Sequence, residues 1–149
     1  MSIRVIAFAC LLLSVPAYAK DDCQAAKGAT VAGKVSSVSD GDTMTVGADK
    51  VRLFGLDAPP NSSPSGKLSA KALTTLVTGK EVKCQVVDKS KSGRCVAVCT
   101  SAGKDVSEQM IESGSAFMLR GLAYFSNWQA RYDAAELNAR SNKRGFWAN

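Results

Sequence analysis

Four charged side chains stand in three short segments whose residue types suit phosphate chemistry. The segments are residues 40–43 (Asp-Gly-Asp-Thr), 51–60 (Val-Arg-Leu-Phe-Gly-Leu-Asp-Ala-Pro-Pro) and 93–94 (Gly-Arg). Asp42 and Asp57 offer carboxylate oxygens, the ligands that a hard cation such as Ca²⁺ prefers. Arg52 and Arg94 offer planar guanidiniums, which can clamp a phosphate through paired hydrogen bonds. These types predict a cation and a phosphate bound side by side.

The backbone carbonyl of Ala58 is the third oxygen expected at the cation. Because calcium takes six to eight oxygen ligands, water and substrate phosphate must supply the others. Aspartates also form turns and caps, and for Asp40 we keep that plainer interpretation. An arginine such as Arg52 within an apolar run faces solvent or a site, since its charge is too costly to bury unpaired. The alternative for both arginines is a surface ion pair, which contributes under about 1 kcal/mol.

These motifs need a scaffold that brings distant segments together. Alternating and apolar runs predict strands at 30–38, 44–46, 51–56, 82–86 and 95–100. Helical spacing predicts helices at about 68–77, 106–111 and 127–142, and Phe146 and Trp147 are expected to anchor the last segment. The order is β-β-β-α-β-β-α-α, mostly β with α. It matches a five-stranded OB-fold barrel, whose usual ligands are oligonucleotides or oligosaccharides.

The motifs and their order resemble the staphylococcal nuclease (thermonuclease) family, calcium-dependent phosphodiesterases built on an OB-fold. The resemblance extends from Val31 to Trp147, nearly the whole expected domain. It implies Ca²⁺ as cofactor and nucleic acid, DNA or RNA, as partner. It also implies that Arg52 and Arg94 contact the scissile phosphate from two sides and stabilise charge there.

Pro60 departs from the family motif, which normally places a glutamate, the proposed general base, at this position. General-base assistance contributes about 10²–10⁴-fold to a rate, and proline has no side-chain acceptor. Glu81 or Asp88 could replace the base only if the fold brings one of them to the site. A tyrosine that often precedes Gly-Arg in the family is here Ser92.

The first nineteen residues have the pattern of a secretory signal. A short positive start is followed by the apolar run 5–15 and by Ala17-Tyr18-Ala19, a small-x-small cleavage site. We expect a signal peptide at 1–19, a polar leader at 20–29 and one domain at 30–149. The product would be periplasmic or secreted, with no membrane segment after cleavage. It would act as a monomer, and its remaining net charge of +5, after Arg4 is lost, suits a polyanionic partner.

Four cysteines remain after the expected cleavage, an even number that favours disulfides in an oxidising compartment. Three pairings are possible. Cys84 and Cys99 would face each other across a hairpin around 89–93, which leaves Cys23 to pair with Cys95. Metal binding by these cysteines is disfavoured, because the chain has no C-x-x-C motif and no histidine.

The lack of histidine also excludes Ser-His-Asp and Cys-His catalysis. Lys89 and Lys91 precede Arg94 and are candidate contacts to a nucleic-acid backbone. Tyr124, Phe125, Trp128 and Tyr132 could stack on bases, although the helical spacing of Trp128 and Tyr132 favours the core for those two. The leading hypothesis is therefore a calcium-dependent phosphodiesterase with attenuated activity. The alternatives are an inactive OB-fold module that binds an oligonucleotide or anionic oligosaccharide, and a structural or partner-binding envelope protein.

Overall fold

The computed structural model describes residues 23–121 and 126–148, so the expected signal peptide at 1–19, Tyr124 and Phe125 lie outside the described residues. The strands are β1 (Thr30–Asp40), β2 (Thr43–Val46), β3 (Asp49–Leu53), β4 (Leu56–Asp57), β5 (Glu81–Lys89), β6 (Cys95–Ser101), β7 (Lys104–Asp105) and β8 (Phe117–Met118). The helices are α1 (Pro64–Val77), α2 (Val106–Glu112), α3 (Ser126–Ser141) and the 3₁₀ turn η1 (Gly145–Trp147). None of the described helices is long and apolar enough to span a membrane.

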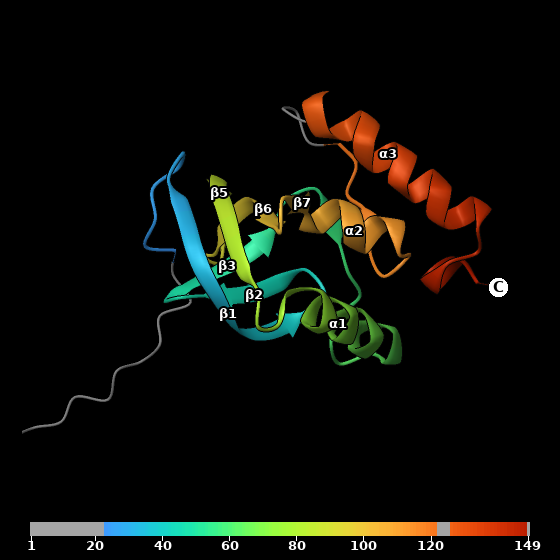
Figure 1. Cartoon of the computed structure of the whole chain (residues 1–149), viewed down its shortest axis with the longest axis horizontal. Helices are drawn as coiled ribbons and strands as arrows, with labels where there is room; N and C mark the ends of the chain where they lie inside the picture. Colours follow the sequence, from blue (N-terminus) through green and yellow to red (C-terminus); the bar gives the residue numbers. More distant parts are fainter. Residues whose placement is uncertain (1–22, 122–125, 149) are drawn as a thin grey trace, which may run out of the picture.

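Five strands form a closed mixed barrel, which confirms the predicted OB-type architecture (Figure 1). Antiparallel pairing runs in the order β3-β2-β1-β5-β6. The barrel closes through a parallel pairing of β3 with β6, in which Arg52 lies opposite Val96. Closure satisfies the edge backbone groups that an open sheet would leave unpaired. It also places β3 next to a strand more than forty residues further along the chain.

The run from Val51 to Leu56 is not one strand, as its apolar pattern predicts, but two. β3 ends at Leu53, and Gly55 turns the chain with a φ of 76°, a left-handed conformation that favours glycine. β4 then leaves the barrel and pairs with β8, with Asp57 opposite Phe117. Asp57 therefore sits beside the barrel wall rather than within it.

The barrel interior is lined by alternate residues of the strands, as the period-two pattern requires. In β5 and β6 the inward side chains include both members of one disulfide, Cys84–Cys99, which are direct cross-strand partners. The second disulfide, Cys23–Cys95, ties the start of the described chain to β6. The hairpin pattern predicts the first of these pairs, and the second is the pair that this choice leaves.

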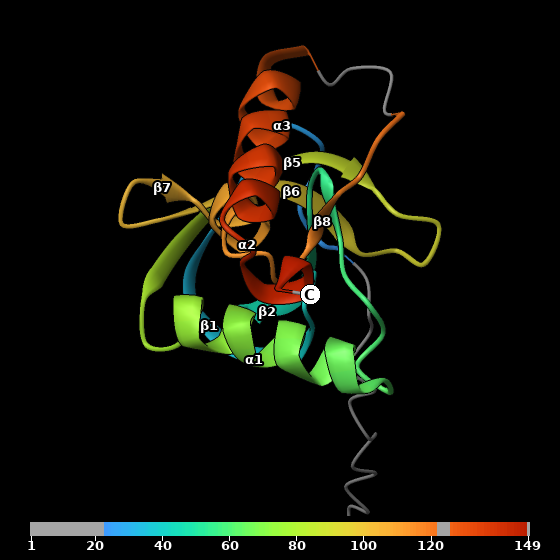
Figure 2. The ribbon, with the colours of Figure 1, turned by 90° about the vertical axis from the view of Figure 1, so that its right-hand side faces the viewer.

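The helices lie against the barrel and against each other (Figure 2). Asp105 caps α2 by accepting the backbone N–H of Glu108, and its other carboxylate oxygen accepts the hydroxyl of buried Tyr132 from α3. This contact joins the two C-terminal helices. η1 ends the described chain by stacking Phe146 on Phe117 of β8. The aromatic anchor predicted for this end is therefore present.

Helix α1 begins shortly after the segment that carries Asp57. Its first turn packs closely on that segment because Gly66, which has no side chain, lies at the contact. Ser63 caps the helix by accepting the N–H of Gly66. A Cβ atom on Gly66 would lie 1.9 Å from the carbonyl oxygen of Pro60, and one on Gly41 would lie 1.8 Å from Oγ of Ser69. Both distances are far below van der Waals contact. α1 therefore supports the loops at 40–42 and 57–60, through the Ser69 side chain at Gly41 and through backbone contact at Pro60.

Glu136 ties α3 to the segment after β8. Its carboxylate, almost fully buried, accepts the N–H of Met118 at 3.1 Å and the guanidiniums of Arg120 at 2.6 Å and Arg140 at 3.2 Å. Burial acts to raise the pKa of Glu136, but the hydrogen bonds and positive charges outweigh it and lower the pKa from its ordinary value of 4.5. The ionised form is the one that the fold stabilises.

Gly66→Ala is predicted to destabilise the fold and disturb the loop at 57–60. Alanine favours a helix over glycine by about 1 kcal/mol, but the new methyl group must displace the Pro60 carbonyl, and such overpacking typically costs about 1–3 kcal/mol. The cost of the clash should exceed the gain in helix propensity. Lys67→Ala, on the exposed side of the same turn, is the matched control and should change stability by under about 0.5 kcal/mol. Denaturant unfolding of both variants tests this, and a stabilised Gly66→Ala protein would contradict the described packing.

Glu136→Gln is predicted to lose about 1.5–3 kcal/mol of stability at pH 7, the range for hydrogen bonds to a charged group. Because the folded-state pKa is lowered, the stabilising effect is present above 4.5 and is lost as the pH falls below it. The difference in free energy of unfolding between wild type and Glu136→Gln should therefore become smaller at acidic pH. Asp133→Asn, which alters a more exposed pair with Arg120, is the control. A gap that stays constant from pH 7 to pH 3 would contradict this account.

Candidate active site

Arg52 stands at the centre of the residues that the sequence motifs single out. In the barrel register it lies opposite Thr43 of β2 on one side and Val96 of β6 on the other. Arg94 precedes β6 by one residue, so the closure of the barrel brings it to the same end as Arg52. Two arginines 42 positions apart in the sequence thus become neighbours through strand pairing alone.

The guanidinium of Arg52 bridges the two candidate metal ligands. Nη1 pairs with Oδ2 of Asp42, and Nη2 donates to Oδ1 of Asp57 at 2.9 Å. Asp42 is nearly buried, whereas the side chain of Asp57 is 58% exposed. A buried carboxylate needs a partner to offset its lost hydration, and Arg52 provides it. The bridge shows that the two carboxylates converge on one point.

Thr43 links the Asp42 carboxylate to the second arginine. Its hydroxyl donates to Oδ1 of Asp42 at 2.6 Å and accepts Nη1 of Arg94 at 3.1 Å. Ser92 accepts Nε of Arg94 at 3.0 Å, and the Ser90 hydroxyl accepts the Arg94 backbone N–H. Arg94 is therefore oriented from two sides. Ser92, which stands where the family often has tyrosine, acts here on the arginine itself.

These side chains surround one cavity of about 200 Å³. It is lined by Asp40, Asp42, Arg52, Asp57, Ala58, Pro60 and Arg94. All five residues predicted to hold the metal and the phosphate therefore meet in one place. Asp40 lines the cavity as well, although we interpret it from the sequence as a turn residue; one of its oxygens accepts the N–H of Asn61 at 3.1 Å.

The donor set fits a calcium ion. Asp42 and Asp57 already share one cationic group, since both pair with the same guanidinium. Ala58 lines the same cavity, and Asp40 adds a further carboxylate there. Oxygen donors of this kind, with room for water, match the preference of Ca²⁺. A cation between the carboxylates would compete with Arg52 for Asp42, which leaves the guanidinium available to a phosphate.

A second cavity of about 310 Å³ adjoins the first, because Arg52 and Arg94 line both. Phe54, Val96 and Leu119 give it apolar surface. The two lysines predicted to contact substrate, Lys89 and Lys91, are at its edge. Lys91 is exposed, whereas the amine of Lys89 donates to the carbonyl of Cys23 at 3.0 Å and so also holds the start of the described chain.

Position 60 offers no proton acceptor in its side chain, and its backbone is already engaged. The Pro60 carbonyl accepts the N–H of Ser63 at 2.9 Å and its hydroxyl at 2.8 Å. Of the two carboxylates that could replace the base, Asp88 lines the second cavity beside the arginines. Glu81 begins β5 and so lies at the opposite end of the strand that Asp88 nearly completes.

Thr43, Ser92 and Asp40 belong to this constellation, yet the sequence predicts no role for them in binding the metal or the phosphate. Thr43 and Asp40 lie within the quoted Asp-Gly-Asp-Thr segment, so their proximity to Asp42 is a usable signal. The contact between Thr43 and Arg94 has no such signal, because it depends on how β2 and β6 come together around β3.

Comparison with known proteins matches residues 50–149 of the chain to the family model described as "Staphylococcal nuclease homologue". A probable staphylococcal-like nuclease from Oryza sativa subsp. japonica is 36% identical over 101 residues, 66% of this chain and 29% of that protein. The chain thus spans less than a third of the length of this plant relative.

Bacterial proteins match over more of their length. An uncharacterized endonuclease from Escherichia coli O157:H7 is 30% identical over 125 residues, 80% of this chain and 79% of that protein. Succinoglycan biosynthesis protein ExoI from Rhizobium meliloti (strain 1021) is 32% identical over 124 residues, 75% of this chain and 62% of that protein. The match to the family model over most of the chain, on a barrel of the expected type, places this protein in the staphylococcal nuclease family.

Proposed function

We propose that this protein is an exported, calcium-dependent phosphodiesterase that acts on nucleic acid, at a rate reduced by the proline at position 60. The observation that carries the proposal is the common cavity: two guanidiniums and three carboxylates from three separate segments line it together. Membership of a nuclease family supports a nucleic-acid substrate, and the family's usual dependence on calcium supports the cofactor.

In this proposal the arginines bind the phosphate. Arg52 and Arg94 approach it from β3 and from the start of β6, and their charge stabilises the extra negative charge that develops during hydrolysis. Thr43 and Ser92 hold Arg94 in orientation. Asp42, Asp57 and the Ala58 carbonyl would hold Ca²⁺, which supplies electrostatic stabilisation of the same charge. Lys91 would contact the nucleic-acid backbone at the edge of the second cavity.

The proposed attenuation follows from position 60. A general base must lie within hydrogen-bond reach of the attacking water, and the Pro60 side chain has no acceptor. Asp40 and Asp88 line the two cavities, but neither is placed as a replacement by any contact. Hydrolysis would then depend on the arginines and the metal alone.

Export is supported by the cysteine chemistry. Both disulfides join residues that lie apart in the sequence, with separations of 72 and 15 residues. Such bonds persist in oxidising compartments such as the periplasm. The signal-like pattern of residues 1–19 agrees with this location.

A second candidate function is binding without turnover. Pro60 favours it, because loss of the base removes hydrolysis before it removes phosphate binding. The ligand would be an oligonucleotide or an anionic oligosaccharide. A relative named for the biosynthesis of succinoglycan supports the saccharide.

The direct test is cleavage of single-stranded DNA by the purified oxidised protein. We expect slow cleavage that requires Ca²⁺, stops with EGTA and falls by at least about 10²-fold in Arg94→Ala, the cost typical of losing one preorganised donor. Lys83→Ala removes one positive charge from an exposed position of β5 and should cleave like wild type. Calorimetry should show weak Ca²⁺ binding that Asp42→Ala abolishes. Cleavage retained by Arg94→Ala would identify a contaminating nuclease and refute the proposal.

Pro60→Glu is predicted to raise the cleavage rate by about 10²-fold or more, because it restores only the missing acceptor. The stability change should be small, under about 1 kcal/mol, since removal of a proline mainly increases the freedom of the unfolded chain. Pro60→Gln has similar size without a base and is the matched control. If Pro60→Glu binds Ca²⁺ but neither it nor wild type cleaves DNA, the protein is a binding module.

A further inference from the structure

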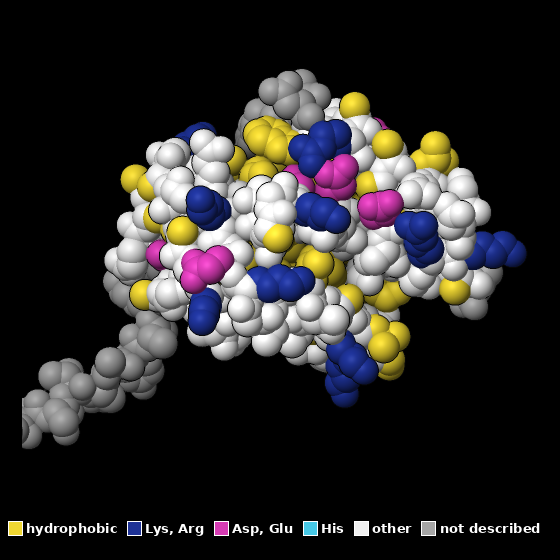
Figure 3. All heavy atoms as spheres, viewed as in Figure 1, with side chains coloured by type: hydrophobic (Ala, Val, Ile, Leu, Met, Phe, Trp, Pro, Cys, Tyr) yellow, Lys and Arg dark blue, Asp and Glu magenta, His cyan; other side chains and the backbone are white. Residues whose placement is uncertain are grey.

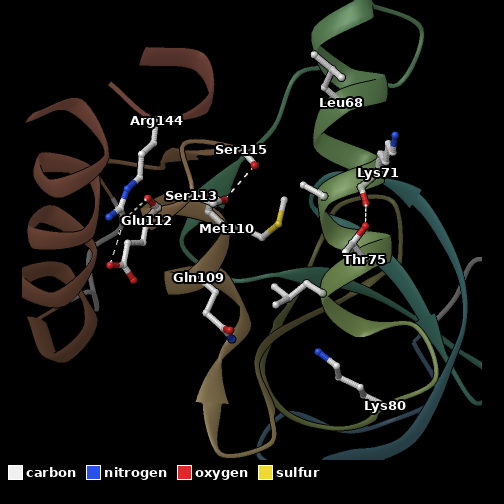
Figure 4. A pocket seen from close by; sticks show the side chains of 12 residues that line it. Leu68, Lys71, Thr75, Lys80, Gln109, Met110, Glu112, Ser113, Ser115 and Arg144 are labelled. Carbon is white, nitrogen blue, oxygen red and sulfur yellow. Dashed lines mark hydrogen bonds and ion pairs between the residues drawn. The ribbon is translucent and has the colours of Figure 1, made fainter. Parts of the chain in front are cut away.

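A groove of about 800 Å³ lies between α1 and α2, apart from the cavity that holds the arginines. Figure 4 shows α1 along one side and α2 with the segment that leads to η1 along the other. None of the twelve residues that line the groove lines the phosphate cavity. The groove is therefore a separate surface feature of the protein.

The floor of the groove is apolar. α1 has two apolar stripes: Leu73 and Val77 are fully buried in the core, whereas Leu68, Ala72 and Leu76, spaced four residues apart, line the groove. From α2, the side chain of Met110 points across towards α1 and, being almost fully buried, closes the base of the groove (Figure 4). Leu68 is 64% exposed, which is unusual for a large aliphatic side chain in a helix that already has a buried face. A second apolar stripe of this kind is typical of a helix with a further partner.

The edge of the groove is positively charged. Lys71 and Lys80, from α1 and just beyond its end, line it, and neither pairs with a carboxylate within the described ranges. The third cation, Arg144, is 3.5 Å from Glu112 and so has a partner (Figure 4). Basic and hydrophobic side chains also lie next to each other over α1 in the space-filling view (Figure 3). Two unneutralised lysines beside an apolar stripe favour an anionic, amphipathic ligand.

We propose that this groove binds an acidic amphipathic helix of a partner protein. Its leucine-like side chains would pack on Leu68 and Leu76, and its carboxylates would pair with Lys71 and Lys80. A helix laid in a groove between two helices is a common mode of peptide recognition.

Two other ligands fit the groove less well. Single-stranded nucleic acid gains much of its affinity from aromatic side chains that stack on its bases, and none of the lining residues is aromatic. A second copy of this chain carries a net charge of +6. A net positive partner is attracted less strongly to Lys71 and Lys80 than an acidic partner is. Charge complementarity therefore selects an acidic partner.

The probe is a fluorescein-labelled synthetic helix of about four turns with leucines at i, i+3, i+4 and i+7 and glutamates on both flanks, the pattern of an amphipathic helix. Its control has the same composition with the leucines scrambled. Fluorescence anisotropy with the oxidised full domain should detect binding of the first peptide only, and binding should weaken with added salt. Equal binding of the scrambled peptide would refute the proposal.

Variants locate the binding surface. Lys71→Glu/Lys80→Glu should weaken binding by about tenfold or more, from the loss of two ion pairs and the new repulsion. Lys34→Glu/Lys67→Glu makes the same change in net charge at exposed positions that do not line the groove. It should bind the peptide like wild type. Leu68→Glu alters an exposed side chain, so the protein should fold, and it should lose peptide binding.

The proposal is wrong if both charge-reversed double variants lose affinity equally, because binding would then follow net charge and not the groove. It is also wrong if a single-stranded oligonucleotide displaces the peptide. Dimerisation of the protein alone that Leu68→Glu abolishes would assign the groove to a second copy. None of these readouts uses phosphodiester cleavage, so the result is independent of the proposed activity.

Discussion

The parallel pairing of β3 with β6 is the constraint on which the candidate site depends. Antiparallel hairpins bring near neighbours together, but this pairing joins strands that lie far apart in sequence and places Arg52 beside the start of β6. Arg94 thereby reaches Thr43, and through Thr43 reaches Asp42. An arginine in an apolar strand would be costly without partners. The convergence of Asp42 and Asp57 on Arg52 offsets that cost and, by the same contacts, assembles the ligands of the proposed metal.

Sequence patterns predict the fold well where the forces are local. Alternating burial identifies β5 and β6, helical spacing and Gly114 identify α2, and hairpin register pairs Cys84 with Cys99. They fail where one residue overrides a longer pattern. The apolar run from Val51 to Leu56 reads as a single strand, but the left-handed turn at Gly55 divides it. The same contrast holds for the site. The motifs predict which residues take part, but they do not predict the Thr43–Arg94 contact, because it joins strands that meet only when the barrel closes.

The shape of the loop at position 60 does not depend on the side chain there. The loop at 57–60 is held by backbone contacts: the Pro60 carbonyl accepts two hydrogen bonds from Ser63, and Gly66 lies directly against it. None of these contacts needs the side chain at position 60. The presence or absence of a proton acceptor at this position therefore does not alter the support for Asp57 and Ala58. Substitutions at position 60 can therefore test the proposed hydrolysis separately from the proposed phosphate binding.

Helix α1 belongs to both the phosphate site and the groove, so a ligand in the groove bears on the site through it. One side of α1 supports the loops at Gly41 and Pro60, and another side carries Leu68 and Leu76. A ligand shifts a conformational equilibrium only if it binds one conformation better than another. The contacts of Gly66 with Pro60 and of Ser69 with Gly41 leave no space for α1 to move towards the loops. A helix bound in the groove would therefore hold α1 where it is, and with it the loops that carry Asp42 and Asp57.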